Sequence, residues 1–236
     1  PGNGSGRVRG IQQYHESVKT AHPGSRVALN VPDWDHKEIE RGTIMTIPQA
    51  GQECSAVDGL LETPRQLSGP IQHDRELLAY RATDRRGVQV LLENREPLLE
   101  DEAGLARLNW LEGRAFLRPG DRIILRDHSD RHLLGCLTVL NPDPDRTFSE
   151  DSYREWLHQR YPVTLESLLE SNLTRAGALR LADLADGTPY AQAEYAERVD
   201  GDGIRRVGED WVLDEEWWTG MADRIVDRVR TYHESH

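Results

Sequence analysis

The sequence predicts a mainly β protein with a helical last third, in which β-barrels precede a small domain of helices and a hairpin. The first observation is the stretch Leu117–Pro142, where the apolar runs Arg122–Leu125 and Leu133–Leu140 flank a short polar turn, as in two adjacent antiparallel strands. The second is a series of short candidate strands about ten residues apart before it, a spacing typical of barrels. The third is a change to helical periodicity after Asp145. The sequence therefore predicts β-barrels followed by a winged-helix domain.

The first 50 residues are expected to form part of a barrel. The predicted strands are Arg7–Tyr14, Arg26–Val31 and Thr43–Ile47, the last stopped by Pro48. Three short strands cannot close a barrel by themselves. We therefore expect residues 1–50 to be an incomplete barrel that needs further strands.

Residues 51–142 are expected to form a second barrel. Its predicted strands are Ser55–Glu62, Glu76–Ala82, Gly87–Leu92 and Ala103–Leu111, followed by the two apolar runs. Prolines and glycines punctuate these strands, and the run from Asp84 to Gly87 is predicted to be a hairpin tip. Asn141-Pro142 is predicted to end the last strand, because proline lacks the N–H that a ladder needs.

The last third is expected to be helical after a linker at residues 143–147, in which prolines favour an extended chain. In residues 148–236 the predicted helices are Ser149–Arg160 (with Ser149 as N-cap), Thr164–Ser171, Ala176–Asp183 and Glu215–His233. Gly201–Arg206 and Asp210–Leu213 are predicted to form the small hairpin, or wing. Helices followed by a hairpin fit a winged-helix domain.

Composition indicates a soluble, cytoplasmic protein with no membrane partner. Apolar residues make up 37% of the 236 residues, the mean hydropathy is -0.69, and no stretch is long and apolar enough for a transmembrane helix. The chain opens with Pro1 and shows no signal peptide, and we expect it to be a piece of a longer protein. Cys54 and Cys136 fit free, packed thiols, and a disulfide is the alternative.

The charge is strongly acidic and unevenly distributed. The net charge is -12, and residues 148–236 hold 10 Lys and Arg against 19 Asp and Glu, whereas residues 1–147 hold 19 against 22. Because nucleic-acid binding surfaces are basic, RNA contacts are expected in the first two-thirds. The predicted winged helix is not expected to bind RNA strongly.

Three stretches give the sequence a family resemblance. LRPGDRIILRDHSDRHLLGCLTVLNP, residues 117–142, resembles the closing hairpin of domain III in selenocysteine-specific elongation factors. Residues 8–31, VRGIQQYHESVKTAHPGSRVALNV, followed by IERGTIM, resemble the second half of domain II in translational GTPases, and RIVDRVRTYHESH at the C-terminus resembles the family's exit helix. The resemblance implies part of translation-factor domain II, a domain III barrel and the first winged helix of a C-terminal array.

The resemblance implies a GTPase, but the sequence assigns no catalytic residue to this chain. A phosphate-binding loop needs GxxxxGK[ST], and neither Lys19 nor Lys37 follows a glycine. GTP and Mg²⁺ are therefore expected in a GTPase domain outside this sequence, and the chain itself is predicted to hold no cofactor. His233 and His236 share a helix face but lack a third ligand, so no metal site is predicted.

Arg26 is the candidate for an aminoacyl pocket. In the family, the arginine of the G-x-R-V-A-L-N pattern lines the domain II pocket that takes the aminoacyl end of the tRNA, and Gly24, Arg26 and Asn30 fall on that pattern. A guanidinium beside a selenolate anion would favour selenocysteine over neutral serine. The alternative is an arginine at a strand start that pairs with a surface carboxylate.

The polar turn carries the candidates for tRNA backbone contacts. In related factors the equivalent domain III turn meets the T-stem of the tRNA, and donors to phosphates here are Arg126, His128, Ser129 and Arg131. The alternative is a solvated hairpin turn. His128-Ser129-Asp130 is not a catalytic triad, because adjacent residues cannot converge as nucleophile, base and orienting group.

The expected function is part of GTP-dependent delivery of selenocysteinyl-tRNA to the ribosome at UGA codons. This piece would supply tRNA-contacting barrels and a spacer winged helix, while winged helices nearer the C-terminus of the family would read an mRNA hairpin. The alternative function is a non-translational adaptor whose barrel and winged helix make protein contacts.

Overall fold

The structure, a computed structural model, describes residues 5–35, 37, 39–145, 148, 150–199 and 203–235. The chain divides into two compact units, the first ending at Thr43 and the second beginning at Ile44. The domain boundaries predicted from the sequence stay predictions.

The first unit is a small antiparallel sheet with strand order β2-β1-β3. Its strands are β1 (Gly10–Gln13), β2 (Glu16–Val18) and β3 (Val27–Asn30). No described residue between 5 and 43 is buried, and Leu29, paired with Ile11 in the ladder, is 42% exposed. The sheet thus has apolar side chains that its own residues do not enclose.

The predicted strand Thr43–Ile47 is wrong, since these residues form no strand. Gly42 and Gln49 lie on either side of it with φ of 102° and 67°, which turns the chain away from an extended path. No strand among the described residues pairs with the segment, and Ile47 remains 73% exposed.

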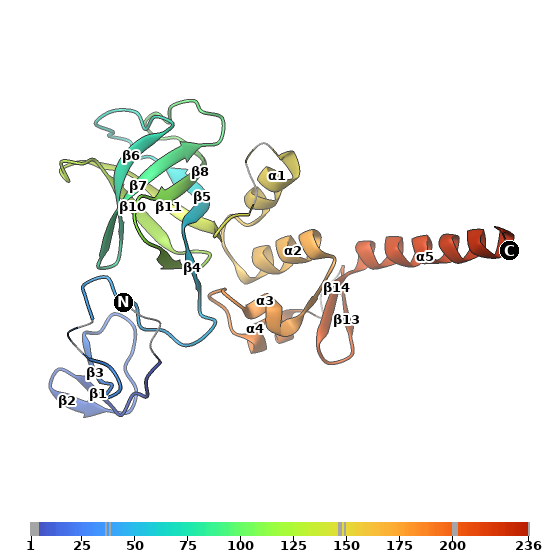
Figure 1. Cartoon of the computed structure of the whole chain (residues 1–236), viewed down its shortest axis with the longest axis horizontal. Coiled ribbons are helices and arrows are strands. Elements are labelled where there is room, and N and C mark those ends of the chain that lie inside the picture. The colour runs from blue at the N-terminus through green and yellow to red at the C-terminus, as the bar shows by residue number, and fades with distance from the viewer. Residues whose placement is uncertain are drawn as a thin grey trace. The chain divides into compact units, whose positions relative to one another are not determined.

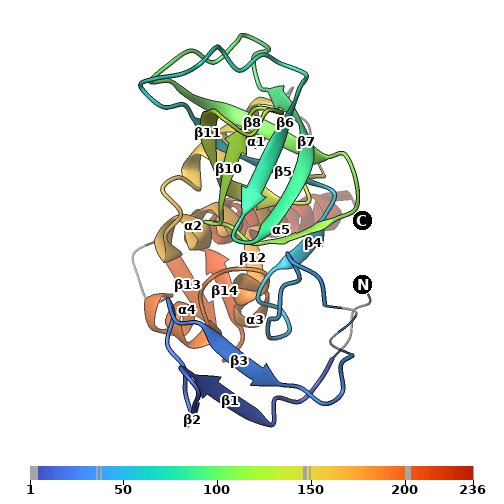
Figure 2. The ribbon, with the colours of Figure 1, turned by 90° about the vertical axis from the view of Figure 1, so that its left-hand side faces the viewer.

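The second unit begins with a closed six-stranded antiparallel barrel of order β10-β11-β5-β8-β7-β6 (Figures 1 and 2). Its strands are β5 (Ala56–Glu62), β6 (Arg75–Arg81), β7 (Asp84–Leu92), β8 (Ala103–Trp110), β10 (Arg122–Arg126) and β11 (Leu133–Pro142). A two-stranded ribbon of β4 (Gln52–Cys54) and β9 (Ala115–Leu117) lies beside it. Alternating side chains fill the interior with fully buried Leu, Ile and Val.

One detail of the barrel differs from the sequence prediction. Residues 84–87 belong to β7, because Arg81 pairs with Asp84 and the turn lies at Ala82 and Thr83. The last strand ends at Pro142, as predicted, and the partner of Pro142 across the ladder is Val57. A proline fits there because it stands at the end of the strand, where one missing N–H costs little.

Among its described residues, the helical part combines five helices with a three-stranded sheet of order β12-β14-β13 (Figure 2). Its elements are α1 (Asp151–Gln159), α2 (Leu165–Ala176), β12 (Ala178–Arg180), α3 (Leu181–Ala185), α4 (Gln192–Arg198), β13 (Ile204–Val207), β14 (Trp211–Asp214) and α5 (Glu215–Ser235). β13 and β14 form the wing expected from the sequence. The predicted N-cap Ser149 lies outside the described residues.

The predicted helix Ala176–Asp183 is wrong. Gly177 ends α2 with φ of 73°, and a side chain there would lie 2.3 Å from the indole of Trp217. The chain then pairs with β14 before α3 begins. A positive-φ glycine after a helix is a common stop signal, and here Trp217 of α5 requires it.

A buried polar cluster joins the barrel to α1. Arg107 of β8 donates two hydrogen bonds of 2.7 Å to the fully buried carboxylate of Asp58, and the Tyr153 hydroxyl donates a third of 2.6 Å. The amide of Asn141 donates to the Tyr153 oxygen at 2.9 Å. Burial raises the pKa of Tyr153 far above its usual range, with Asp58 adding to the rise, so the phenol stays a donor.

Candidate nucleic-acid interface

The turn between β10 and β11 projects from the barrel with a defined backbone. The ladder ends at Arg126 and Leu133, after an irregularity between Leu125 and Arg126. The Asp130 amide donates to the Asp127 carbonyl at 2.9 Å, and Asp130 has φ of 58°. Aspartate tolerates this left-handed conformation better than most residues. We call residues 127–132 the tip.

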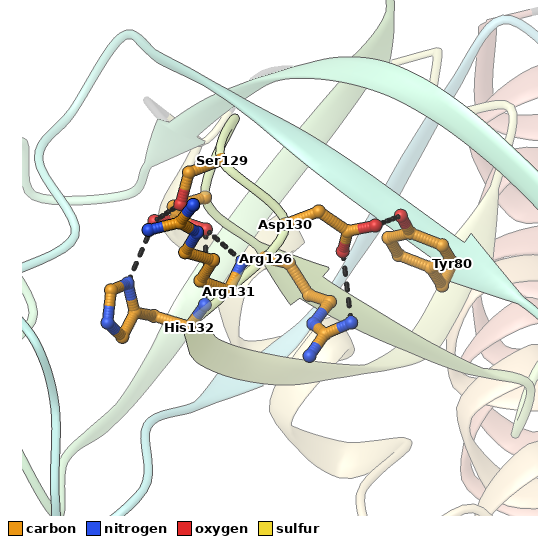
Figure 3. A network of polar contacts seen from close by, with 7 residues as sticks. Tyr80, Arg126, Ser129, Asp130, Arg131 and His132 are labelled. Carbon is orange, nitrogen blue, oxygen red and sulfur yellow. Dashed lines mark hydrogen bonds and ion pairs between the residues drawn. The ribbon is translucent and has the colours of Figure 1, made fainter.

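The carboxylate of Asp127 organises the tip. It accepts hydrogen bonds from the Ser129 hydroxyl at 2.6 Å, the Arg131 amide at 3.0 Å, and both the amide and ring Nδ1 of His132 at 3.2 and 3.0 Å (Figure 3). These bonds, led by the one from Ser129 and then that from the His132 ring, hold the pKa of Asp127 far below its usual range. The tip is therefore preorganised around an ionised carboxylate.

Asp130 faces the barrel and holds the other side of the network. It accepts a hydrogen bond of 2.6 Å from the Tyr80 hydroxyl and one of 3.0 Å from Arg126 (Figure 3). The bond to Asp130 raises the pKa of Tyr80. The guanidinium carbons of Arg126 and Arg85 each lie 6.0 Å from the centre of the Tyr80 ring, at the outer limit of a cation–π contact.

The four predicted contact residues share the tip, but their side chains are in different situations. Arg126 is half-buried and paired with Asp130, and the Ser129 hydroxyl is occupied by Asp127. His128 and Arg131 are exposed, and within the described part of the chain their side chains form no hydrogen bond or ion pair. These two are therefore the donors available to an incoming anion.

Sequence reasoning missed Asp127 and Tyr80, which hold the tip in place. Asp127 carries a usable local signal, because an aspartate in a short polar turn often accepts hydrogen bonds from backbone amides that follow it. Tyr80 has no such signal, because it lies on β6 and reaches the tip only when β10 pairs with β6.

Arg26 belongs to the first unit. It is exposed and immediately precedes β3. Its side chain pairs with no carboxylate among the described residues, so the surface ion pair considered as an alternative is not found there. The aminoacyl-pocket role stays a prediction.

The barrel and its tip match a known family model. Residues 60–146 match the β-barrel domain of the selenocysteine-specific elongation factor. The selenocysteine-specific elongation factor of Escherichia coli K12 is 26% identical over 240 residues, which cover 98% of this chain and 36% of that protein. That of Desulfomicrobium baculatum is 24% identical over 252 residues, covering 99% of this chain and 38% of that protein.

Over nearly its whole length this chain is similar to selenocysteine-specific elongation factors. A crystal structure of a bacterial member, EF-Sec, has the same fold, with a TM-score of 0.66 at 18% identity over 96% of this chain and 34% of that one. The mixed β and α architecture predicted from the sequence is confirmed. The chain spans little more than a third of the length of its curated relatives in the family.

Within the described residues, no helix has the length and apolar character needed to cross a lipid bilayer. No group of three or more His, Cys, Asp or Glu in the same part of the chain has a metal-binding arrangement.

Proposed function

We propose that this chain is the part of a selenocysteine-specific elongation factor that contacts selenocysteinyl-tRNA, and that the tip binds the tRNA phosphate backbone. The observation that carries the proposal is the Asp127 network. It uses up the acceptor atoms of Asp127 inside the tip and leaves His128 and Arg131 facing solvent. Phosphate contacts from such donors position a nucleic acid without reading its sequence.

The rest of the proposed role, outside the tip, is inferred from the similarity to selenocysteine-specific elongation factors. In this proposal, GTP and Mg²⁺ are held by a GTPase domain, the ribosome receives the tRNA, and an mRNA hairpin is read by other winged helices. The helical part of this chain is a spacer. Its acidity supports that assignment, because phosphate binding requires a basic surface.

The tip is tested by tRNA binding to the chain at several salt concentrations, with wild type, Arg131→Gln and His128→Gln. Both variants should weaken binding, and loss of the Arg131 charge should reduce the slope of log affinity against log salt by about one. The control is Arg95→Gln, which removes the same charge from an exposed barrel position. Equal effects of all three variants, or tRNA binding that none of them changes, would exclude the tip as the contact. No tRNA binding by wild type would favour the adaptor role.

The Arg26 pocket is tested in the full-length factor. We expect Arg26→Gln to abolish the preference for selenocysteinyl-tRNA over seryl-tRNA while GTP binding stays intact, because the guanidinium would stabilise the selenolate. Arg9→Gln, an exposed arginine on the same unit, is the matched control. A preference that survives in Arg26→Gln would rule out the pocket role.

A further inference from the structure

A cavity of about 470 Å³ lies in the second unit, between the exit of the barrel and the helical part. Pro119, Asn141 and Pro142 come from the barrel side, and α1, α2 and the region of α3 supply most of the rest. Its lining is Gln52, Pro119, Asn141, Pro142, Trp156, Arg160, Asn172, Arg175, Ala176, Leu179, Asp183, Asp186, Gly187 and Thr188. The tip and its tRNA proposal use none of these residues.

Arg160 is a buried cation in this wall. It is 4% exposed, and it donates from Nε to the Leu140 carbonyl at 2.8 Å and from one terminal nitrogen, Nη1, to Ser171 Oγ and Asn172 Oδ1 at 3.2 and 2.8 Å. All three acceptors are neutral, and no carboxylate among the described residues forms an ion pair with it. Burial lowers the pKa of Arg160 to about 10, so it remains charged at neutral pH.

A second arginine adds to the positive charge. The guanidinium carbons of Arg160 and Arg175 lie 4.4 and 4.7 Å from the centre of the Trp156 ring. Arg175 pairs with Asp145 at 3.0 Å, but that carboxylate is 67% exposed. One solvated carboxylate thus accompanies two guanidiniums. The other charged lining residues, Asp183 and Asp186, are exposed.

We propose that this cavity binds a small oxyanion, either a carboxylate or a phosphate, against Arg160 and Arg175. A buried charge without a counter-ion is unfavourable, and the second terminal nitrogen of Arg160, Nη2, donates none of the bonds described above. A guanidinium presents paired donors that match the oxygens of either anion. The side-chain amide of Asn172, whose oxygen accepts from Arg160, adds a nitrogen donor.

The test is calorimetric titration of the chain with inorganic phosphate and, separately, with acetate, at constant ionic strength set by chloride. Saturable binding of one anion is expected, together with a rise of the melting temperature as that anion replaces chloride. Arg175→Gln should weaken binding about 10-fold or more, since a charged hydrogen bond is lost. Comparison of phosphate with acetate identifies the chemistry of the natural ligand.

The control is Arg198→Gln, which removes an exposed arginine paired with Glu166 on the helical part away from the cavity lining. It should bind as wild type does. Arg160→Lys keeps the positive charge but loses the paired N–H donors of the guanidinium, so it should bind the anion more weakly. If Arg160→Lys does not fold, the comparison of Arg175→Gln with wild type tests the proposal. Absence of saturable binding by wild type, or equal binding by Arg175→Gln and Arg198→Gln, would overturn the proposal and make Arg160 a purely structural clamp.

Discussion

At the scale of single residues, the tip depends on one carboxylate. Asp127 accepts four hydrogen bonds from three residues that follow it within five positions. Because these bonds favour the ionised form, the folded protein binds a proton at Asp127 less readily than the unfolded chain does.

The first prediction concerns acid stability. A carboxyl whose pKa is depressed by folding stabilises the protein fully above its unfolded pKa, about 4, and that stabilisation is lost as the pH falls below it. We expect Asp127→Asn to melt at a lower temperature than wild type at pH 6, with the difference shrinking between about pH 4 and pH 3. Melting curves across this range measure it. Glu112→Gln, at an exposed turn of the barrel, should retain the wild-type pH dependence; if it matches Asp127→Asn, the network has no special role.

The limits of sequence reasoning at this scale are visible in the tip. The donors Arg126, His128, Ser129 and Arg131 stand together in the sequence, and the family resemblance of their turn selects them. Which of them remain available was not predictable, because Asp130 and Tyr80 meet only through strand pairing. The same holds for Arg160, whose burial depends on contacts with β11 and α2.

At the scale of elements, alanine substitutions at two glycines of the helical part are expected to change stability in opposite directions. Gly220 lies inside α5, and a methyl group there would meet nothing within 4 Å. Gly177 has positive φ and contacts Trp217. Gly220→Ala should stabilise α5 by about 1 kcal/mol, seen as slower hydrogen exchange of its amides. Gly177→Ala should destabilise by at least about 1 kcal/mol in urea unfolding. Faster exchange in Gly220→Ala would contradict the structure of α5.

Elements in which apolar residues recur with a clear spacing are predictable from the sequence, and very short elements are not. β10 alternates exposed and buried residues, β11 is a long and mostly buried apolar run, and α5 has a clear helical pattern. β4 and β9 have three residues each, too few for a pattern. The sequence predicts a helix over β12 because its residues, Ala-Leu-Arg, favour helices locally, whereas pairing with β14 makes this segment a strand.

At the scale of the whole molecule, the two units differ in what they enclose. The described residues between 5 and 43 include none that is buried, while the barrel encloses a large aliphatic core. Since local stability follows burial, amides of β1–β3 should exchange within the first time points of a hydrogen-exchange experiment, and those of β5, β8 and β11 should be protected far longer. Equal protection of the two units would show that the first sheet gains a stabilising partner.

The cluster of Asp58, Arg107, Tyr153 and Asn141 has a consequence for the history of the sequence. A change at one of these positions leaves the buried charge or hydroxyl of another without its hydrogen-bond partner. Substitutions should therefore be inherited together, even though Asp58 and Tyr153 lie 95 positions apart. Across relatives, the barrel and the first helix should carry matched residues here, so that exchange of one part between two relatives succeeds only when the whole cluster moves with it.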